Sequence, residues 1–124
     1  MGTIVKMTCK GCNQAWEGYT GQGIQHGRLE NVLKLYPEEV QGHVRELTTG
    51  ERFPIYDFAM HIGSCMKCKA LVSVPVLRLR ERGTFVGLCP ECGGEVQADA
   101  AEMEQQCPVC GKQDWDLQDI GRWD

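Results

Sequence analysis

CPECGG at residues 89–94 and CPVCGK at 107–112 belong to a set of four Cys-x-x-Cys segments that contains all eight cysteines of this 124-residue chain. The other two segments are CKGC at 9–12 and CMKC at 65–68. Two cysteines separated by two residues can approach one ion from a single tight turn, and four thiolates complete a tetrahedral site. The sequence therefore predicts two metal sites of four sulfurs each, which together use every cysteine. These ligands are Cys9, Cys12, Cys65, Cys68, Cys89, Cys92, Cys107 and Cys110.

The residue that follows each pair supports this interpretation. It is Asn13, Gly93 or Gly111 in three of the segments, and these residue types tolerate the positive φ that a tight metal-binding turn needs. Lys69 stands at this place in CMKC, so we expect a less regular turn there.

Composition is that of a small globular protein, with 42% apolar residues and many glycines. Two small lobes of such a chain need a metal or disulfide staple to be stable. The start, MGTIVKMTCK, lacks the apolar run of a signal peptide, and no stretch reaches the length of a membrane span. We therefore expect a cytoplasmic protein whose cysteines bind metal, with a disulfide framework as the alternative.

Charge is distributed unevenly along the chain. Residues 1–68 carry seven basic and seven acidic side chains, whereas residues 89–124 carry two basic and nine acidic ones. The formal net charge is −4, and two zinc ions with four thiolates each would take it to about −8. This acidity disfavours non-specific binding to DNA or RNA, which depends on neutralising phosphates.

The pairing of the four segments is a separate question, on which the gaps give a preference. They are separated by 52, 20 and 14 residues. The shortest gap is close to the usual spacing of a compact zinc site, so we pair Cys89 and Cys92 with Cys107 and Cys110. The remaining site then joins the segments at 9–12 and 65–68. The alternative joins 65–68 to 89–92 and forces 9–12 to meet 107–110 across the whole chain.

CPECGG followed by CPVCGK resembles a zinc ribbon, a small module with two metal-binding turns on β-hairpins, over about residues 84–120. CKGC and CMKC bracket a long insertion and resemble a second, interrupted ribbon. The whole layout, including the closing Gly121, Trp123 and Asp124, is similar to uncharacterised small bacterial double zinc-ribbon proteins. The resemblance implies a fold and two bound Zn²⁺ ions, but no particular activity.

The resemblance implies a small metal-stabilised α+β fold made of two β-hairpin zinc ribbons, and hydrophobic periodicity predicts a short helical insertion in the first. We expect one domain over residues 1–82, with the insertion at about 28–62, and a second domain over 83–124. Inside the insertion, Leu29, Val32, Leu33 and Tyr36 form a helical stripe. Pro37 then begins a second helix, with its buried stripe at Val40, Val44 and Leu47 and a stop near Gly50. The predicted strands cover residues 3–8, 14–20, 55–62, 70–82, 84–88 and a last segment with Trp115, Leu117 and Ile120.

The strand at 70–82 carries the main candidate for partner binding. Val72, Val74 and Val76 alternate on one face, Leu71, Leu77 and Leu79 lie opposite, and three arginines continue the valine face. These arginines, Arg78, Arg80 and Arg82, would contact an acidic partner or a phosphate. In the alternative interpretation they are a solvated strand end that pairs with the acidic C-terminal lobe.

Other residues offer less specific signals. No histidine is needed as a ligand, so we expect His26, His43 and His61 to be ordinary surface or core residues, with His61 the nearest to a cysteine pair. Trp115 and Trp123 either anchor a partner or close a small core. A thioredoxin-type redox pair would need one Cys-x-x-Cys at a helix N-terminus, whereas four pairs are expected on turns.

Four cysteines per site leave no open position for water, and so we expect no catalysis. The sequence predicts a non-enzymatic protein with two structural zinc sites that binds another protein through the insertion or the basic strand. Two alternatives remain: a nucleic-acid-binding, transcription-related ribbon that uses the three arginines, and an iron electron carrier resembling rubredoxin.

Overall fold

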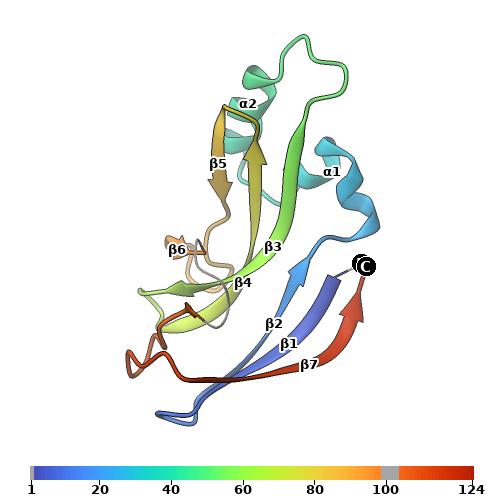
Figure 1. Ribbon diagram of the computed structural model, residues 1–124. Helices are drawn as coiled ribbons and strands as arrows, with labels where there is room; N and C mark the ends of the chain where they lie inside the picture. The colour runs from blue at the N-terminus through green and yellow to red at the C-terminus, as the bar shows by residue number, and fades with distance from the viewer. Residues whose placement is uncertain (1, 99–103) are drawn as a thin grey trace.

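The computed structural model describes residues 2–98 and 104–124, which form an antiparallel sheet with a few short helices (Figure 1). The strand order is β5-β4-β3-β2-β1-β7, and β6 pairs with Ser64 and Cys65 at the end of β3. The helical segments are η1 (Ile24–Gly27), α1 (Leu29–Leu33) and α2 (Glu38–Leu47). The strands are β1 (Gly2–Cys9), β2 (Ala15–Gly21), β3 (Tyr56–Cys65), β4 (Ala70–Leu79), β5 (Gly83–Val86), β6 (Val96–Gln97) and β7 (Trp115–Trp123).

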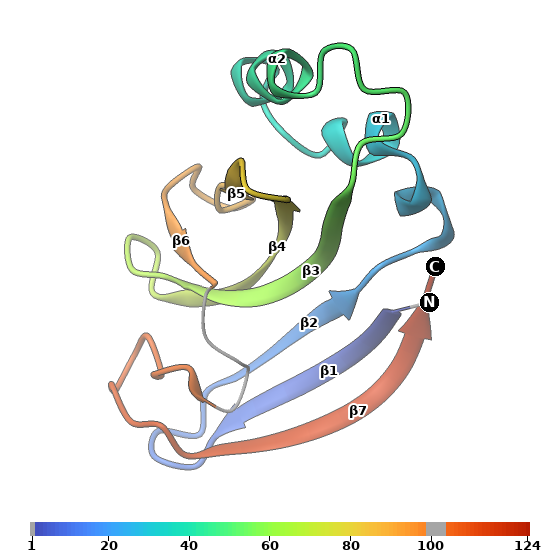
Figure 2. The same cartoon turned by 45° about the horizontal axis from the view of Figure 1, so that its top comes forward.

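The strands fall into two units that are nested in the chain. β1 pairs along its length with β2 and β7, and we call these three strands the outer unit. β3 pairs with β4 over ten residues, β4 pairs with β5, and β3 to β6 form the inner unit. β2 and β3 pair at Gly21 and Met60. Figure 2 shows the outer strands together on one side and β3 to β5 on the other. The continuous segment 56–97 is thus enclosed by strands from both ends of the chain.

A hydrophobic cluster fills the space between the units. Val5 and Met7 of β1 meet Ile62 of β3 and Leu71 of β4, and Trp115 at the start of β7 closes the group. Met7 is only 1% exposed. Burial of one such side chain stabilises the fold by about 1.5–3 kcal/mol. The two units therefore share a core.

β4 is buried on both faces, and the predicted alternation of its side chains is confirmed. Val72, Val74 and Val76 pack against Val96 of β6 and Ala98 on one face. On the other face Leu71 joins the cluster between the units, and Leu77 and Leu79 pack against the insertion. β6 lies so close to β3 that a Cβ on Gly63 would come within 2.5 Å of the Gln97 carbonyl oxygen.

The helical insertion covers the inner sheet through the stripes that the sequence predicts. Val32, Leu33, Tyr36 and Val44 are buried against Phe58, Met60, Leu77 and Leu79. The Tyr36 hydroxyl donates to the Phe85 carbonyl oxygen at 2.7 Å, which ties the helices to β5. Pro37 precedes α2 instead of occupying its first position, with ψ of 156°. β3 begins at Tyr56, so residues 56–62 of the predicted insertion belong to the sheet.

The predicted strand at 70–82 is three residues too long. β4 ends at Leu79, and the chain turns at Arg80 to Arg82 with a φ of 61° at Glu81. Arg82 pairs with Glu51 and donates to the Leu47 carbonyl oxygen, so its partner is the insertion and not the acidic C-terminal lobe. The predicted break between the strands at 70–82 and 84–88 lies after this turn, because glutamate is not a typical residue at positive φ.

The expected two successive ribbons are instead joined in one sheet. β7, from the predicted second domain, lies beside β1 from the first. The domain boundary between residues 82 and 83 stays a prediction.

Candidate metal centres

The four Cys-x-x-Cys segments lie on tight turns with a shared hydrogen-bond pattern. In three of them the amide of the first cysteine donates to the carbonyl five residues later, at 2.8–2.9 Å. The amide of the residue after the second cysteine donates back to the first cysteine's carbonyl at 2.8 Å. These three turns begin at Cys9, Cys89 and Cys107. In the fourth, Cys65 faces Ala70 across the β3–β4 hairpin, which is the same five-residue spacing.

All four residues that follow the pairs have positive φ. The values are 63° for Asn13, 73° for Gly93 and 78° for Gly111, as the sequence predicts. Lys69 also adopts this conformation, with φ of 56°. The expectation of a less regular turn at CMKC is therefore wrong, and Lys69 carries the strain of a side chain in the left-handed region.

The turns bring the eight cysteines into two clusters of four sulfurs. In each cluster every Sγ lies within 4.8 Å of the others. The outer site contains Cys9, Cys12, Cys107 and Cys110, and the inner site contains Cys65, Cys68, Cys89 and Cys92.

This pairing contradicts the one that we favoured from the gap lengths. Strand pairing decides it, because β7 lies against β1 and sets Cys9 opposite Trp115. The amide of Lys10 also donates to the Asp114 carbonyl oxygen, at 2.8 Å. In the inner unit, β4 leaves the turn that carries Cys65 and Cys68, and β5 returns the chain toward it. The alternative pairing, across the whole chain, is the one that forms.

The sulfur positions fit a tetrahedral metal site. The Sγ–Sγ distances are 3.5 Å for Cys9 and Cys110, and 3.6 Å for Cys12 and Cys107. In the inner site they are 3.4 Å for Cys65 and Cys92, and 3.7 Å for Cys68 and Cys89. A tetrahedron with metal–sulfur bonds of about 2.3 Å has edges of about 3.8 Å. A disulfide would need about 2.05 Å, so these sulfurs are free thiols arranged as a ligand set.

Backbone amides prepare one cysteine of each site for metal binding. The first cysteine of every pair is buried, and the second lies nearer the surface. The Cys68 amide lowers the pKa of the Cys65 thiol to about 6, against the opposing effect of burial. Burial raises the pKa of Cys9, but hydrogen bonds from the Cys12 and Gly11 amides outweigh it and hold the value at about 7. These two thiols are thus near the thiolate form that a metal requires.

A buried polar bridge connects the two sites. The Gln105 side chain accepts a hydrogen bond from the Ser64 hydroxyl at 3.1 Å and donates to the Ile62 carbonyl oxygen at 3.4 Å. The indole of Trp115 donates to the Gln105 carbonyl oxygen at 2.6 Å. Ser64 precedes Cys65 of the inner site, and Gln105 lies two residues before Cys107 of the outer site. Sequence reasoning missed this bridge, since a lone serine and glutamine give no signal.

The other predicted residues take varied positions. Trp115 is 3% exposed and belongs to the core, whereas Trp123 packs against Tyr19 with ring centroids 5.3 Å apart. His26 accepts a hydrogen bond from the Gly23 amide at 2.9 Å through Nδ1, and burial lowers its pKa. His43 packs against Phe85. No histidine of the described residues belongs to either cysteine cluster.

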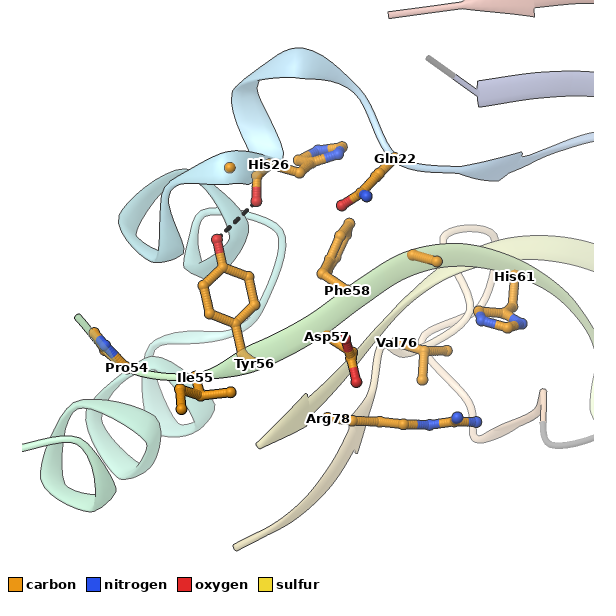
Figure 3. Close-up of a pocket in the computed structure, with 12 residues that line it drawn as sticks. Gln22, His26, Pro54, Ile55, Tyr56, Asp57, Phe58, His61, Val76 and Arg78 are labelled. Carbon is orange, nitrogen blue, oxygen red and sulfur yellow. Dashed lines mark hydrogen bonds between the residues drawn. The ribbon is translucent and has the colours of Figure 1, made fainter. Parts of the chain in front are cut away.

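The three predicted arginines do not form one stripe. Arg78 lines a cleft of about 520 Å³ at the edge of β3, where Gln22 and His26 lie across the strand from it (Figure 3). Arg80 and Arg82 line a second cleft at the end of β4. Their predicted role in partner binding stays a prediction.

Comparisons with protein-family models, curated proteins and solved structures give no match. Within residues 2–98 and 104–124, no helix has the length and apolar character needed to cross a membrane.

Proposed function

We propose that this chain is a non-enzymatic zinc protein of the cytosol with two structural four-cysteine sites of the zinc-ribbon type, and that it serves as a module for binding another protein. The observation that carries the metal role is the closure of both sites. Each offers four sulfurs at tetrahedral spacing, so an ion bound there has no coordination position left for water or substrate.

The position of the sites supports a structural role. The outer site joins the β1–β2 turn to the segment that leads into β7, and so it ties together strands from both ends of the chain. The inner site ties the β3–β4 turn to the segment after β5. Because a metal gathers these turns, its binding free energy contributes to folding.

Zinc is the metal that we favour. Four thiolates in a closed tetrahedron form the usual structural zinc site, and zinc does not change its oxidation state there. Iron binds the same ligand set, so the choice is a matter for measurement.

Elemental analysis of protein purified after expression with both metals available tests this choice. Two zinc ions per chain and no colour are expected, and a red iron protein would contradict the proposal. Circular dichroism with and without a strong chelator then tests the structural role. Chelation should lower the melting temperature sharply, whereas an unchanged spectrum and melting curve would refute a structural metal.

The proposed partner role rests on the surface that lies away from the metals. The insertion is fixed on the inner sheet by a hydrophobic cluster and by the Tyr36 hydrogen bond, so it presents a defined surface. A pull-down from the native host with the full metal-loaded chain tests the role. Deletion of residues 28–62 is unsuitable as a control, because it removes most of β3.

A further inference from the structure

The end of the inner sheet that lies farthest from its metal site carries an unusual surface. β3 begins there at Tyr56 and β4 ends there at Leu79, whereas Cys65 and Ala70 mark the opposite end. The loop after α2 and the β4–β5 turn meet at this end around a cleft of about 490 Å³. We call Arg52, Phe53, Ile55 and Arg80 the distal surface.

Two apolar side chains of the distal surface are strongly exposed. Phe53 is 84% exposed and Ile55 is 64% exposed. By contrast, the apolar side chains Val32, Leu33 and Val44 of the neighbouring helices are completely buried. Single exposed apolar residues are common on proteins. Here, however, both flank one cleft within three residues of each other, and aromatic side chains in such places are typical binding anchors.

The charged groups around these apolar side chains are three arginines and two glutamates, namely Arg52, Arg80, Arg82, Glu51 and Glu81. The Arg52 guanidinium lies 5.7 Å from the Phe53 ring centroid, at cation–π distance. Arg82 pairs with Glu51 and holds the loop to the turn, so the surface is organised in advance. Within the part of the chain that the structure describes, neither Arg52 nor Arg80 has a carboxylate partner.

We propose that the distal surface binds an acidic segment of a partner protein that also carries an aromatic or aliphatic side chain. This inference rests on the proposed interaction function and names its partner class. Carboxylates would meet Arg52 and Arg80, and the apolar side chain would cover Phe53 and Ile55. The cleft lining carries one more positive than negative charge, whereas residues 89–124 carry nine acidic and two basic side chains, so an acidic segment is repelled by that part of the chain and favoured at this cleft.

A nucleic acid fits this surface less well. Its affinity grows with the number of phosphates that are neutralised, and the distal surface offers two free arginines on an acidic molecule. Phosphate attraction would therefore be small, whereas an acidic peptide also gains from covering the exposed apolar groups.

Selection of a random-peptide phage library on the metal-loaded full chain tests the proposal. The recovered peptides should be enriched in Asp and Glu beside Phe, Leu or Ile. Their affinity, measured by fluorescence anisotropy, should fall about tenfold or more in Arg80→Glu and in Phe53→Ser. The matched controls Lys34→Glu and Ile24→Ser should bind within about twofold of wild type, since Ile24 is 81% exposed but lies on η1. Each variant must retain two metal ions and the wild-type spectrum.

Three results would overturn the proposal: no recovered peptide, peptides without acidic enrichment, or equal losses in the control variants. Binding of oligo-dT that is abolished by Arg80→Glu would assign the surface to nucleic acid instead. If the purified chain held no metal, the proposed function would fail. If the chain held two metal ions and unfolded on chelation, but the peptides bound the distal-surface variants as tightly as wild type, only this inference would fail.

Discussion

Replacing Gln105 with leucine should weaken metal binding at the outer site, although Gln105 is not a ligand. Its side chain is 5% exposed and connects the segment before Cys107 to Ser64 and Ile62 on β3. Because that segment also carries the outer site's second turn, losing the bridge should release the turn from the inner unit. The substitution therefore tests whether the two metal sites depend on each other.

The expected magnitude follows from the hydrogen bonds that are lost. Leucine leaves the Ile62 carbonyl oxygen without its 3.4 Å donor, and Ser64 keeps the Gln106 carbonyl oxygen at 3.5 Å as its remaining acceptor. A buried hydrogen bond contributes about 1 kcal/mol net, so the loss of two, with part of one recovered by the remaining Ser64 contact, places the total near 1–2 kcal/mol. If this cost falls on the outer site, its metal affinity drops about 5- to 30-fold.

Stepwise removal of zinc by a chromophoric chelator measures this effect. Both proteins should lose the outer ion before the inner one, but Gln105→Leu should lose it at a clearly lower chelator concentration than the wild-type protein. Gln118→Leu, which alters an exposed glutamine on β7, serves as the control and should behave as wild type. An outer-site affinity within twofold of wild type in Gln105→Leu would refute the bridge as a link between the sites.

Three further predictions concern single residues. Lys69→Gly should stabilise the metal-loaded protein by about 1 kcal/mol, because glycine relieves the strain at a φ of 56°; a lower midpoint in urea would contradict this. Cys110→Ser should reduce the metal content by about one ion, and NMR of the cadmium protein should correlate its remaining tightly bound metal with Cys65 and not with Cys9. Burial lowers the pKa of His26 in the folded protein. The stability that His26 contributes is therefore present above the unfolded pKa of about 6.5 and is lost as the pH falls below that value. His26→Gln should flatten the pH–stability curve below pH of about 6.5, and an unchanged slope there would contradict this prediction.

Local features of this protein could be read from the sequence, and long-range ones could not. The turn residues Asn13, Gly93 and Gly111 and the alternation of valines and leucines in β4 each reflect short-range geometry, and the structure confirms them. Cysteine pairing depends on which strands lie together. Gap length gave the wrong preference, because β7 pairs with β1 over eight residue pairs, and this pairing outweighs the advantage of a short loop. The turn at Glu81 lies earlier than the predicted break after residue 82, since an unfavourable local conformation is held there by the contact of Arg82 with Glu51.

The nested pairing also sets an order in which the two sites form. Cys68 and Cys89 of the inner site are 21 residues apart, whereas Cys12 and Cys107 of the outer site are 95 apart. Closing the longer loop from the unfolded chain costs about 1.3 kcal/mol more, on the logarithmic dependence of loop entropy on length. Folding of the inner unit removes most of this difference, because it fixes residues 56–97 and brings the flanking segments toward each other. The inner site should therefore fill first and make the outer site easier to close. Metal at the outer site then joins both ends of the chain over a core that has already formed. The inner unit holds the insertion and the distal surface in place as soon as the inner site is filled.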